Sequence, residues 1–105
     1  MSAISIAHHQ VGHDCVIVQA DGELDFGSLR AFRTALSFAL AAGPSVVVDL
    51  RRARFLSLRN AWALAEIVDT AVRGKIEITV LAGRPEIERV LELAGIRALS
   101  DIPAQ

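Results

Sequence analysis

The chain has 105 residues and a net charge of -1, with an isoelectric point near 6.3; it is 52% hydrophobic and its mean hydropathy is +0.42. This length is enough for one domain, covering residues 1–105, and is short for two. The near-neutral charge argues against a nucleic-acid-binding protein that relies on bulk positive charge. Uninterrupted apolar runs, such as residues 39–42, fall far below the roughly 18 residues that a membrane-spanning helix needs.

The targeting signals and the cysteine content point to one compartment. The first residues lack the basic start and the extended apolar run of a secretory signal peptide. The single cysteine, Cys15, lies in a strand-like run and has no second cysteine with which to form an internal disulfide. A reducing cytoplasm is therefore the expected location, and no direct membrane insertion is expected.

Apolar residues in short runs or at strand spacing predict four strands. These strands cover residues 3–7, 14–20, 46–50 and 76–82. Gly12 marks a hairpin connection between the first two strands. The strand that ends at Leu50 has no polar alternation, as expected when both of its faces are buried in a parallel sheet. A tail over residues 99–102 is a candidate for a last edge strand.

Three helices are expected, over residues 27–42, over residues 60–73, and from Pro85 to a cap at Gly95. The first helix should end at Gly43, in a left-handed conformation, followed by a proline, and the second should end at Gly74. The buried stripe of the second helix is expected to consist of Ala61, Leu64, Ala65, Val68 and Val72.

The element order is therefore ββαβαβα followed by the tail. Helices that join consecutive strands imply right-handed crossovers and a largely parallel sheet, to which the first hairpin adds antiparallel pairing. The expected fold is α/β: a four- to five-stranded, mostly parallel mixed sheet with an N-terminal β-hairpin and three main helices on one face.

Three stretches match a known family pattern in place and order. They are residues 22–25 (GELD), residues 45–62, in which an apolar strand ends in aspartate and a basic loop leads into a helix, and residues 90–96 (VLELAGI). Together they resemble the STAS family of sulfate transporters and anti-sigma factor antagonists, over nearly the whole chain. The resemblance implies a non-enzymatic protein-binding module whose strand, loop and helix start form the surface read by a partner kinase.

The helix start departs from the family pattern. Family members that are switched by phosphorylation have an Asp-Ser-(Ser/Thr)-Gly run there, and this chain has Ser57-Leu58-Arg59-Asn60. Leu58 falls on the acceptor position and cannot accept a phosphoryl group. Ser57 would be the acceptor only after a one-residue slip, and its hydroxyl would equally serve as the N-cap of the helix, as would the side chain of Asn60.

Trp62 lies on the polar side of the expected helix, roughly a quarter-turn from the buried stripe. A tryptophan in this position is a candidate anchor for a protein contact, because aromatic side chains dominate binding hot spots. The alternative is that its ring folds back onto Phe55 or Leu58 as a lid over the core.

Charged residues surround the same helix start. Four arginines crowd a nine-residue span: Arg51, Arg52, Arg54 and Arg59. They would steer an acidic partner or an anion if they form an electropositive rim, or they would simply keep an apolar fold soluble. Asp25 and Asp49 are expected at the C-terminal ends of adjacent strands, where α/β sheets usually place sites. The resemblance implies that such acids help to form the kinase-facing surface, although either would also serve as a cap or turn former.

Little in the sequence favours catalysis, a metal or a cofactor. His8, His9 and His13 suggest a metal site only weakly, because no carboxylate or thiolate stands at a convincing ligand spacing. The glycines are scattered as caps and turns and form no phosphate-binding loop. Cys15 has no obvious base beside it, so nucleophilic catalysis is unsupported.

The first hypothesis is docking on an anti-sigma factor or GHKL-type serine kinase, in the partner-switching regulation of bacterial transcription. The alternative is a structural subunit of a transporter complex or signalling hub, and an anion- or nucleotide-binding domain that uses the arginine-rich loop ranks last. The apolar composition is also compatible with a homodimer. The residues expected to bind the partner are Asp25, Asp49, Arg54, Ser57, Leu58, Arg59, Asn60 and Trp62.

Overall fold

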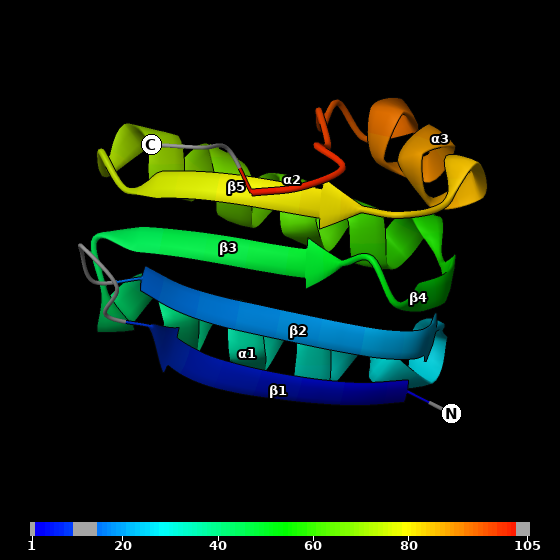
Figure 1. Cartoon of the computed structure of the whole chain (residues 1–105), viewed down its shortest axis with the longest axis horizontal. Helices are drawn as coiled ribbons and strands as arrows, with labels where there is room; N and C mark the ends of the chain where they lie inside the picture. Colours follow the sequence, from blue (N-terminus) through cyan, green and yellow to red (C-terminus); the bar gives the residue numbers. More distant parts are fainter. Residues whose placement is uncertain (1, 10–14, 103–105) are drawn as a thin grey trace.

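The computed structural model describes residues 2–9 and 15–102. Its strands are β1 (Ser2–His9), β2 (Cys15–Leu24), β3 (Ser45–Leu50), β4 (Ala53–Leu56) and β5 (Glu77–Ala82). Its helices are a short 3-10 turn, η1 (Phe26–Ser28), and three α-helices, α1 (Leu29–Ala42), α2 (Leu58–Arg73) and α3 (Pro85–Leu93). The described part of the chain is thus the expected mixed α/β fold, with five strands and three helices (Figure 1).

The sheet has the order β1-β2-β3-β5. β1 pairs antiparallel with β2, whereas β2 with β3 and β3 with β5 are parallel, which confirms the predicted hairpin and the mostly parallel sheet. The tail adds a single bridge at the β5 edge, where the Leu99 N–H donates to the Val80 carbonyl at 2.9 Å and the Ala82 N–H donates to the Leu99 carbonyl at 2.9 Å. The predicted edge pairing of the tail is therefore confirmed at Leu99.

β4 was not expected, because its residues were assigned to a basic loop. β2 continues to Leu24 instead of ending near residue 20. β3 ends at Leu50, so it does not reach the last part of β2. β4 pairs parallel with this overhang, Gly22 to Leu24. The strand buries Ala53 and Leu56 and exposes the two residues between them, so its burial depends on a partner that is distant in sequence. β3 and β4 thus lie one after the other along the same side of β2.

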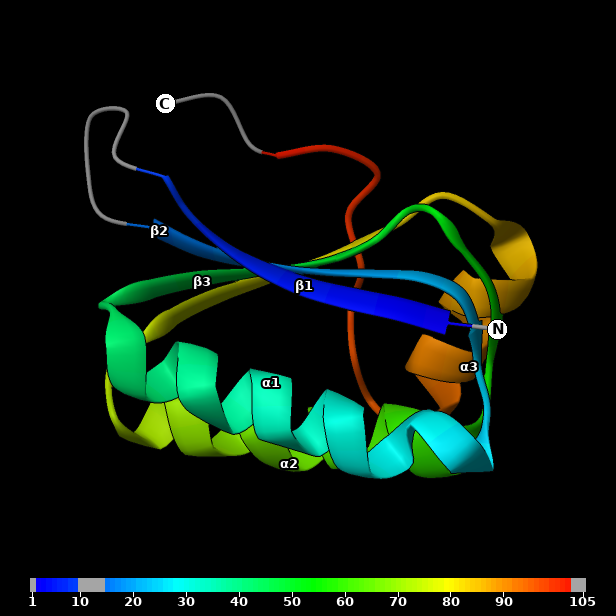
Figure 2. The same cartoon turned by 90° about the horizontal axis from the view of Figure 1, so that it is seen from below.

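The core lies between the sheet and one layer of helices. Figure 2 shows α1 and α2 side by side beneath the sheet, with α3 at one end of that layer, where it packs on α2 and β4. Alternate residues of β2 and β3 point into this layer, and the helices contribute Phe32, Leu36, Leu64, Ile87 and Leu91. In α2 the predicted stripe is wrong at Val72, which is 65% exposed, because the buried position of that turn is Ala71.

Helix ends differ from the expectations at two positions. α2 begins at Leu58, two residues before the predicted start. Gly43 is extended (φ -166°) rather than left-handed; a Cβ at this position would lie 3.1 Å from the Val16 side chain, so close approach to β2 explains the glycine. After α2 the left-handed residue is Lys75 and not Gly74. Gly95 does take the left-handed conformation expected after α3.

Two turns touch near the C-terminal end of the sheet. A Cβ on Gly83 would lie 2.9 Å from the Arg51 carbonyl oxygen, so the chain entering α3 passes directly against the turn between β3 and β4. A side chain at position 83 would therefore collide with the backbone of that turn. Within residues 2–9 and 15–102, no helix has the length and hydrophobicity to cross a membrane.

Candidate partner-binding surface

The candidate surface lies where β2 and β4 end. Leu24 and Leu56 are paired neighbours, so these two parallel strands finish at the same edge of the sheet. β2 continues through Asp25 into η1, and β4 continues through Ser57 into α2. The start of α2 therefore lies beside η1, although more than thirty residues separate them in the chain. The Ser57 N–H donates to the Leu24 carbonyl at 2.9 Å and joins the two turns directly.

Ser57 is the N-cap of α2. Its backbone is extended (φ -69°, ψ 154°), and its hydroxyl oxygen accepts from the Asn60 N–H at 3.1 Å. The same oxygen also accepts from the Asn60 side-chain amide at 2.8 Å. Both lone pairs of the hydroxyl are thus engaged in holding the helix start. This geometry matches the capping interpretation of Ser57 that the sequence left open beside phosphorylation.

Asn60 joins the two strand ends from inside. Its side chain is fully buried, and its amide nitrogen donates to the Leu24 carbonyl at 3.1 Å and to the Asp25 carbonyl at 2.8 Å. The two carbonyl acceptors fix which end of the amide is nitrogen. The Asn60 side-chain carbonyl oxygen is buried and has no hydrogen-bond partner among the described residues. Asn60 therefore holds the turn after β2 against α2, and because its side chain is buried, it supports the predicted partner surface from inside rather than forming its exposed face.

Four large apolar side chains are exposed around the buried hydrogen bonds of Asn60. Phe26 is 70% exposed, Phe55 49%, Leu58 39% and Trp62 53%. They come from η1, β4 and the first turn and a half of α2, and we call them the aromatic surface. The Arg59 guanidinium lies 5.7 Å from the centroid of the Phe26 ring, over its face, which is a cation–π geometry. Exposed apolar side chains gathered in one place are typical of a protein contact site.

The aromatic surface was only partly visible in the sequence. Trp62 is half-exposed and thus accessible to a partner, as the contact-anchor interpretation requires. Phe26 was missed as a surface residue, and Phe55 was considered only as a residue that the Trp62 ring would cover. A signal for Phe26 exists in retrospect, because it lies outside the helical repeat that begins at Leu29 and sits between two turn-forming residues.

The arginines of the loop are engaged with neighbouring side chains. Arg54 pairs with Glu23 at 3.3 Å, and Arg52 lies 3.8 Å from Asp21. Arg51 binds Asp49 through two side-chain nitrogens and its backbone N–H, each at 3.0 Å, and reaches Asp101 of the tail at 3.2 Å. With Arg59 over Phe26, all four guanidinium groups have a neighbour. This argues against an open anion-binding loop, and Arg54 and Arg59 remain as the cations that border the aromatic surface.

Asp25 and Asp49 are not brought together. Asp49 is paired with Gln19 in the sheet, whereas Asp25 follows Leu24. The five positions between Gln19 and Leu24 (24 minus 19) span roughly 17 Å at about 3.3 Å per residue. The two acids are therefore separated along the sheet, because β2 extends beyond β3, and their shared role in partner binding stays a prediction. Asp25 is exposed beside η1 and accepts a weak bond from the Ser28 hydroxyl at 3.4 Å, while the Asp49 side chain is only 12% exposed.

Asp49 has a structural role that makes stability pH-dependent. Hydrogen bonds from the Arg51 side chain lower the pKa of Asp49 against the opposing effect of burial. The stabilisation is therefore complete above the pKa of the unfolded chain, about 3.9, and is lost as the pH falls through the lower pKa of the folded state. We expect Asp49→Asn to lower the free energy of unfolding by about 1–3 kcal/mol at pH 7.

This difference between the wild type and Asp49→Asn should shrink below about pH 4, since protonation removes the same charge from the wild type. Urea unfolding followed by circular dichroism at several pH values measures it. A difference that stays constant down to pH 2 would show that charge is not the reason for the loss.

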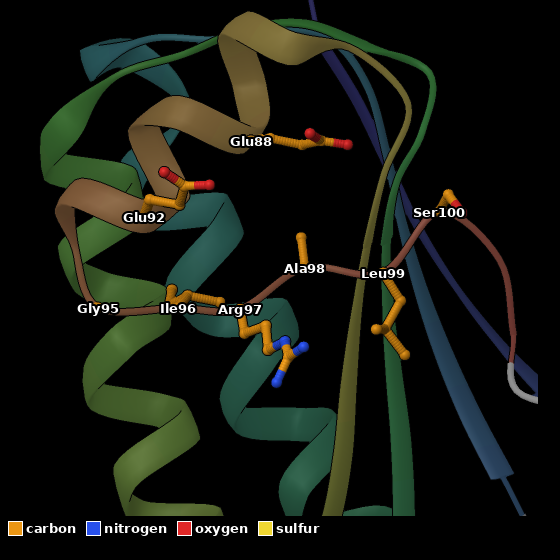
Figure 3. A pocket seen from close by; sticks show the side chains of 8 residues that line it. All are labelled: Glu88, Glu92, Gly95, Ile96, Arg97, Ala98, Leu99 and Ser100. Atoms are coloured by element: carbon orange, nitrogen blue, oxygen red, sulfur yellow. The ribbon is translucent and has the colours of Figure 1, made fainter.

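A separate hollow of about 610 Å³ lies between α3 and the segment that follows it. Figure 3 shows Glu88 and Glu92 projecting from α3 toward this space, while Arg97 points away from them. Its polar side chains are Glu88, Glu92, Arg97 and Ser100, and because Arg97 points away from the two carboxylates, these groups do not converge on one ligand position. The predicted histidine cluster cannot be placed, because His13 and the side chains of His8 and His9 lie outside the described residues.

Comparisons with known proteins agree with this geometry. An anti-sigma factor antagonist from Mycobacterium paratuberculosis superposes with a TM-score of 0.79 at 23% identity, over 90% of this chain and 79% of that one. The antagonist SpoIIAA in its unphosphorylated form gives 0.70 at 16% identity, over 93% and 90%. The STAS domain of an antisigma-factor antagonist from Rhodobacter sphaeroides gives 0.63 at 25% identity, over 81% and 89%.

No functionally curated protein matches the chain. The family model for the STAS domain, however, matches residues 7–103. The structural similarity and this match agree, and the chain belongs to the STAS domain family.

Proposed function

We propose that this protein is a non-enzymatic, cytoplasmic binding module of the anti-sigma factor antagonist type. Its partner is an anti-sigma factor or GHKL-type serine kinase, and it binds through the aromatic surface. The observation that carries the proposal is the exposure of Phe26, Phe55, Leu58 and Trp62 around one helix start. This helix start is also the place where phosphorylated family members carry their acceptor serine.

The aromatic surface has the composition of a binding hot spot. Burial of apolar surface contributes about 25 cal/mol per Å², and large aromatic side chains provide the most area per residue. Its border is charged, with Arg54 and Arg59 on one side and the exposed carboxylate of Asp25 on the other. An apolar centre with a charged rim is the usual arrangement of transient protein contacts.

The surface lacks the usual phosphorylation switch. The side chain at the acceptor position is that of Leu58, which adds to the apolar area. The neighbouring hydroxyl, on Ser57, already accepts two hydrogen bonds as a cap, and phosphorylation would break both. We therefore propose that binding is constitutive toward a kinase of this class, or regulated by a route other than phosphorylation of this helix start.

The proposal predicts that Trp62→Asp weakens binding of the partner by about 30-fold, because loss of an aromatic hot spot costs about 2 kcal/mol. The matched control is Val72→Asp, which introduces the same charge at a similarly exposed position near the other end of α2 and should leave binding intact. The measurement is affinity capture from a lysate of the source organism with each protein as bait, followed by mass spectrometry and titration of the recovered partner.

Recovery of a GHKL-type kinase or anti-sigma factor by the wild type and Val72→Asp, but not by Trp62→Asp, supports the proposal. Recovery of transporter or scaffold subunits would favour the structural role in a larger assembly. Equal recovery of a kinase by all three proteins would place the contact on another face and contradict the role of the aromatic surface.

A further inference from the structure

β1 is the edge strand of the sheet on the side opposite the tail. It is eight residues long, and in the described structure only β2 pairs with it, so its outer row of backbone N–H and C=O groups faces away from the sheet. Natural edge strands are usually shielded by charged side chains, prolines or bulges. β1 (SAISIAHH) contains no lysine, arginine, acid or proline, and it pairs with β2 without a break in register. The strand is therefore open to pairing with another strand.

An apolar groove accompanies this edge. About 650 Å³ of space lies between β1 and α1, lined by Ile4 and Ile6 from the strand and by one face of the helix, which includes Arg30, Thr34 and Phe38. Phe38 is 59% exposed and Ile6 is also exposed, so the groove is open to solvent. Figures 1 and 2 show that α1 runs in the same direction as β1 along it. Arg30 therefore lies toward one end of the groove and Phe38 toward the other.

We propose that the groove and the edge are occupied by a second copy of this chain, in a symmetric dimer in which the two β1 strands pair antiparallel. The two-fold axis then stands perpendicular to the sheet and leaves the helices of both copies on the same face. Residues directly opposite each other must share a face of the sheet. With the axis at Ser5, Ile4 of each copy lies opposite Ile6 of the second copy.

This register suits the side chains on both faces. Ile4 and Ile6 are paired with Ala20 and Val18 of β2, which face the helices, so both isoleucines lie on that side. Opposed β-branched residues are favourable cross-strand pairs, worth about 0.2–1 kcal/mol each. Ser5 faces the other side and is exposed, so two serines meet at the axis without a clash or a buried charge.

The helices meet as a complementary pair. Because α1 runs parallel to β1, the two-fold axis sets the two α1 helices antiparallel, with Arg30 of one copy near Phe38 of the other. No ion pair of Arg30 is found among the described residues, so its guanidinium is available to lie against an aromatic ring. Helices that pack against each other lie about 8–10 Å apart, and the exposed Phe38 side chains are the groups on this face of α1 that would fill the space between the two copies.

Charge favours a copy of the same chain as the occupant. The net charge of -1 gives little repulsion between two molecules, and β1 itself is neutral. The groove has one cation, Arg30, at one end and one aromatic ring, Phe38, at the other. A second copy related by a two-fold axis places its own Phe38 beside Arg30 and its own Arg30 beside Phe38, so the two grooves are complementary. The dimer interface uses β1 and α1, whereas Phe55, Leu58 and Trp62 lie on β4 and α2, so the proposal goes beyond the proposed partner binding and does not depend on it.

Cysteine cross-linking tests the register directly. In a Cys15→Ser background, Ser5→Cys places two thiols opposite each other across the axis. Paired strands bring Cα atoms to about 4.5–5.5 Å, within the range that a disulfide spans. Ala7→Cys is the matched control, because its neighbour in the second copy would be Ala3. Mild oxidation should convert Ser5→Cys largely to a covalent dimer and leave Ala7→Cys monomeric on a non-reducing gel. Equal cross-linking of both variants, or none of either, would overturn the proposal.

A charge-swap experiment tests the helix contact. Phe38→Arg should weaken the dimer at least about tenfold, since it opposes Arg30 of the second copy, and Arg30→Glu should also weaken it. The double variant Arg30→Glu/Phe38→Arg should regain most of the affinity through a new ion pair between copies. The two positions are two turns apart on one helix and cannot pair within a molecule, so rescue reports the dimer alone.

Sedimentation velocity over a concentration series measures each dissociation constant. Leu93→Arg, an exposed position on α3, is the control for added charge and should leave the dimer unchanged, as should Trp62→Asp. A wild-type protein that remains monomeric at its highest soluble concentration would contradict self-pairing and leave this edge to a different partner. A dimer that survives Phe38→Arg but fails with Trp62→Asp would place the contact on the aromatic surface instead.

Discussion

Asn60→Asp should destabilise the protein by about 3 kcal/mol or more at pH 7, although aspartate near a helix N-terminus is normally favourable. The replacement has nearly the same shape, but it exchanges the amide donor for a carboxylate oxygen. That oxygen would face the Leu24 and Asp25 carbonyls at about the 2.8–3.1 Å that separate them from the amide nitrogen. A fully buried charge would then lie against two carbonyl acceptors, and the Ser57 hydroxyl at 2.8 Å would be the one group of these three that could donate to it.

The pH dependence identifies the cause. Burial beside carbonyl oxygens raises the pKa of the introduced carboxyl in the folded state above its unfolded value of about 3.9. The protonated form is therefore favoured in the folded protein, and the destabilisation should be smallest at low pH and should grow as the pH rises. Asn60→Ala, which removes the donor without adding charge, should cost about 1–2 kcal/mol with no such dependence. Urea unfolding of both variants at pH 4.5 and pH 7 gives the comparison. If Asn60→Asp is as stable as the wild type at pH 7, the buried hydrogen bonds of Asn60 do not hold the turn after β2 against α2.

Leu58→Glu should weaken partner binding by at least about 100-fold while leaving the fold intact. Leu58 is the first residue of α2 and is 39% exposed, so a glutamate there is accessible to solvent in the free protein and lies favourably at the helix N-terminus. In the complex the same carboxylate would be buried among apolar groups without a partner, which costs about 3–5 kcal/mol. The expected result is lost binding with an unchanged or slightly raised free energy of unfolding.

Leu58→Gln separates charge from shape. It keeps the length of the side chain without the negative charge, and its loss of affinity should be clearly smaller than that of the glutamate. Isothermal titration with the captured partner, together with thermal unfolding of each variant, makes the comparison. If Leu58→Glu binds as tightly as the wild type, Leu58 lies outside the interface and the aromatic surface is not the docking site.

The sequence predicted the helices and strands that are determined by neighbouring residues in the chain. Helical spacing around Phe32 and Leu36, the apolar run that ends at Leu50, and the proline at the start of α3 each identify an element without reference to distant residues. β4 was missed because its four residues include an arginine and an exposed phenylalanine and become a strand only by pairing with the end of β2. Gly43 was misread for the same reason, since what requires a glycine there is the side chain of Val16.

The sequence predicted a candidate surface at this helix start, but it did not predict which side chains are exposed there. Trp62 and Leu58 were identified from their positions near the helix start, and both are exposed. Asn60 looked like an accessible polar residue, yet it is buried because its acceptors come from a turn thirty-five residues earlier. Asp49 was grouped with Asp25 on the assumption that neighbouring strands end together, and an overhang of one strand is not readable from a single sequence.

The extension of β2 beyond β3 determines how small a fragment of the protein can be and still present the complete aromatic surface. Phe26 reaches it from one side of the sheet edge, and Phe55, Leu58 and Trp62 reach it from the other. A synthetic peptide that copies β4 and α2 would contain three of these side chains, yet it would lack Phe26 and the carbonyls that anchor Asn60, and an isolated helix of this length is marginal in water. Competitive inhibitors or grafted versions of this surface must therefore retain the β2 end and its turn, so the smallest portable unit is close to the whole domain.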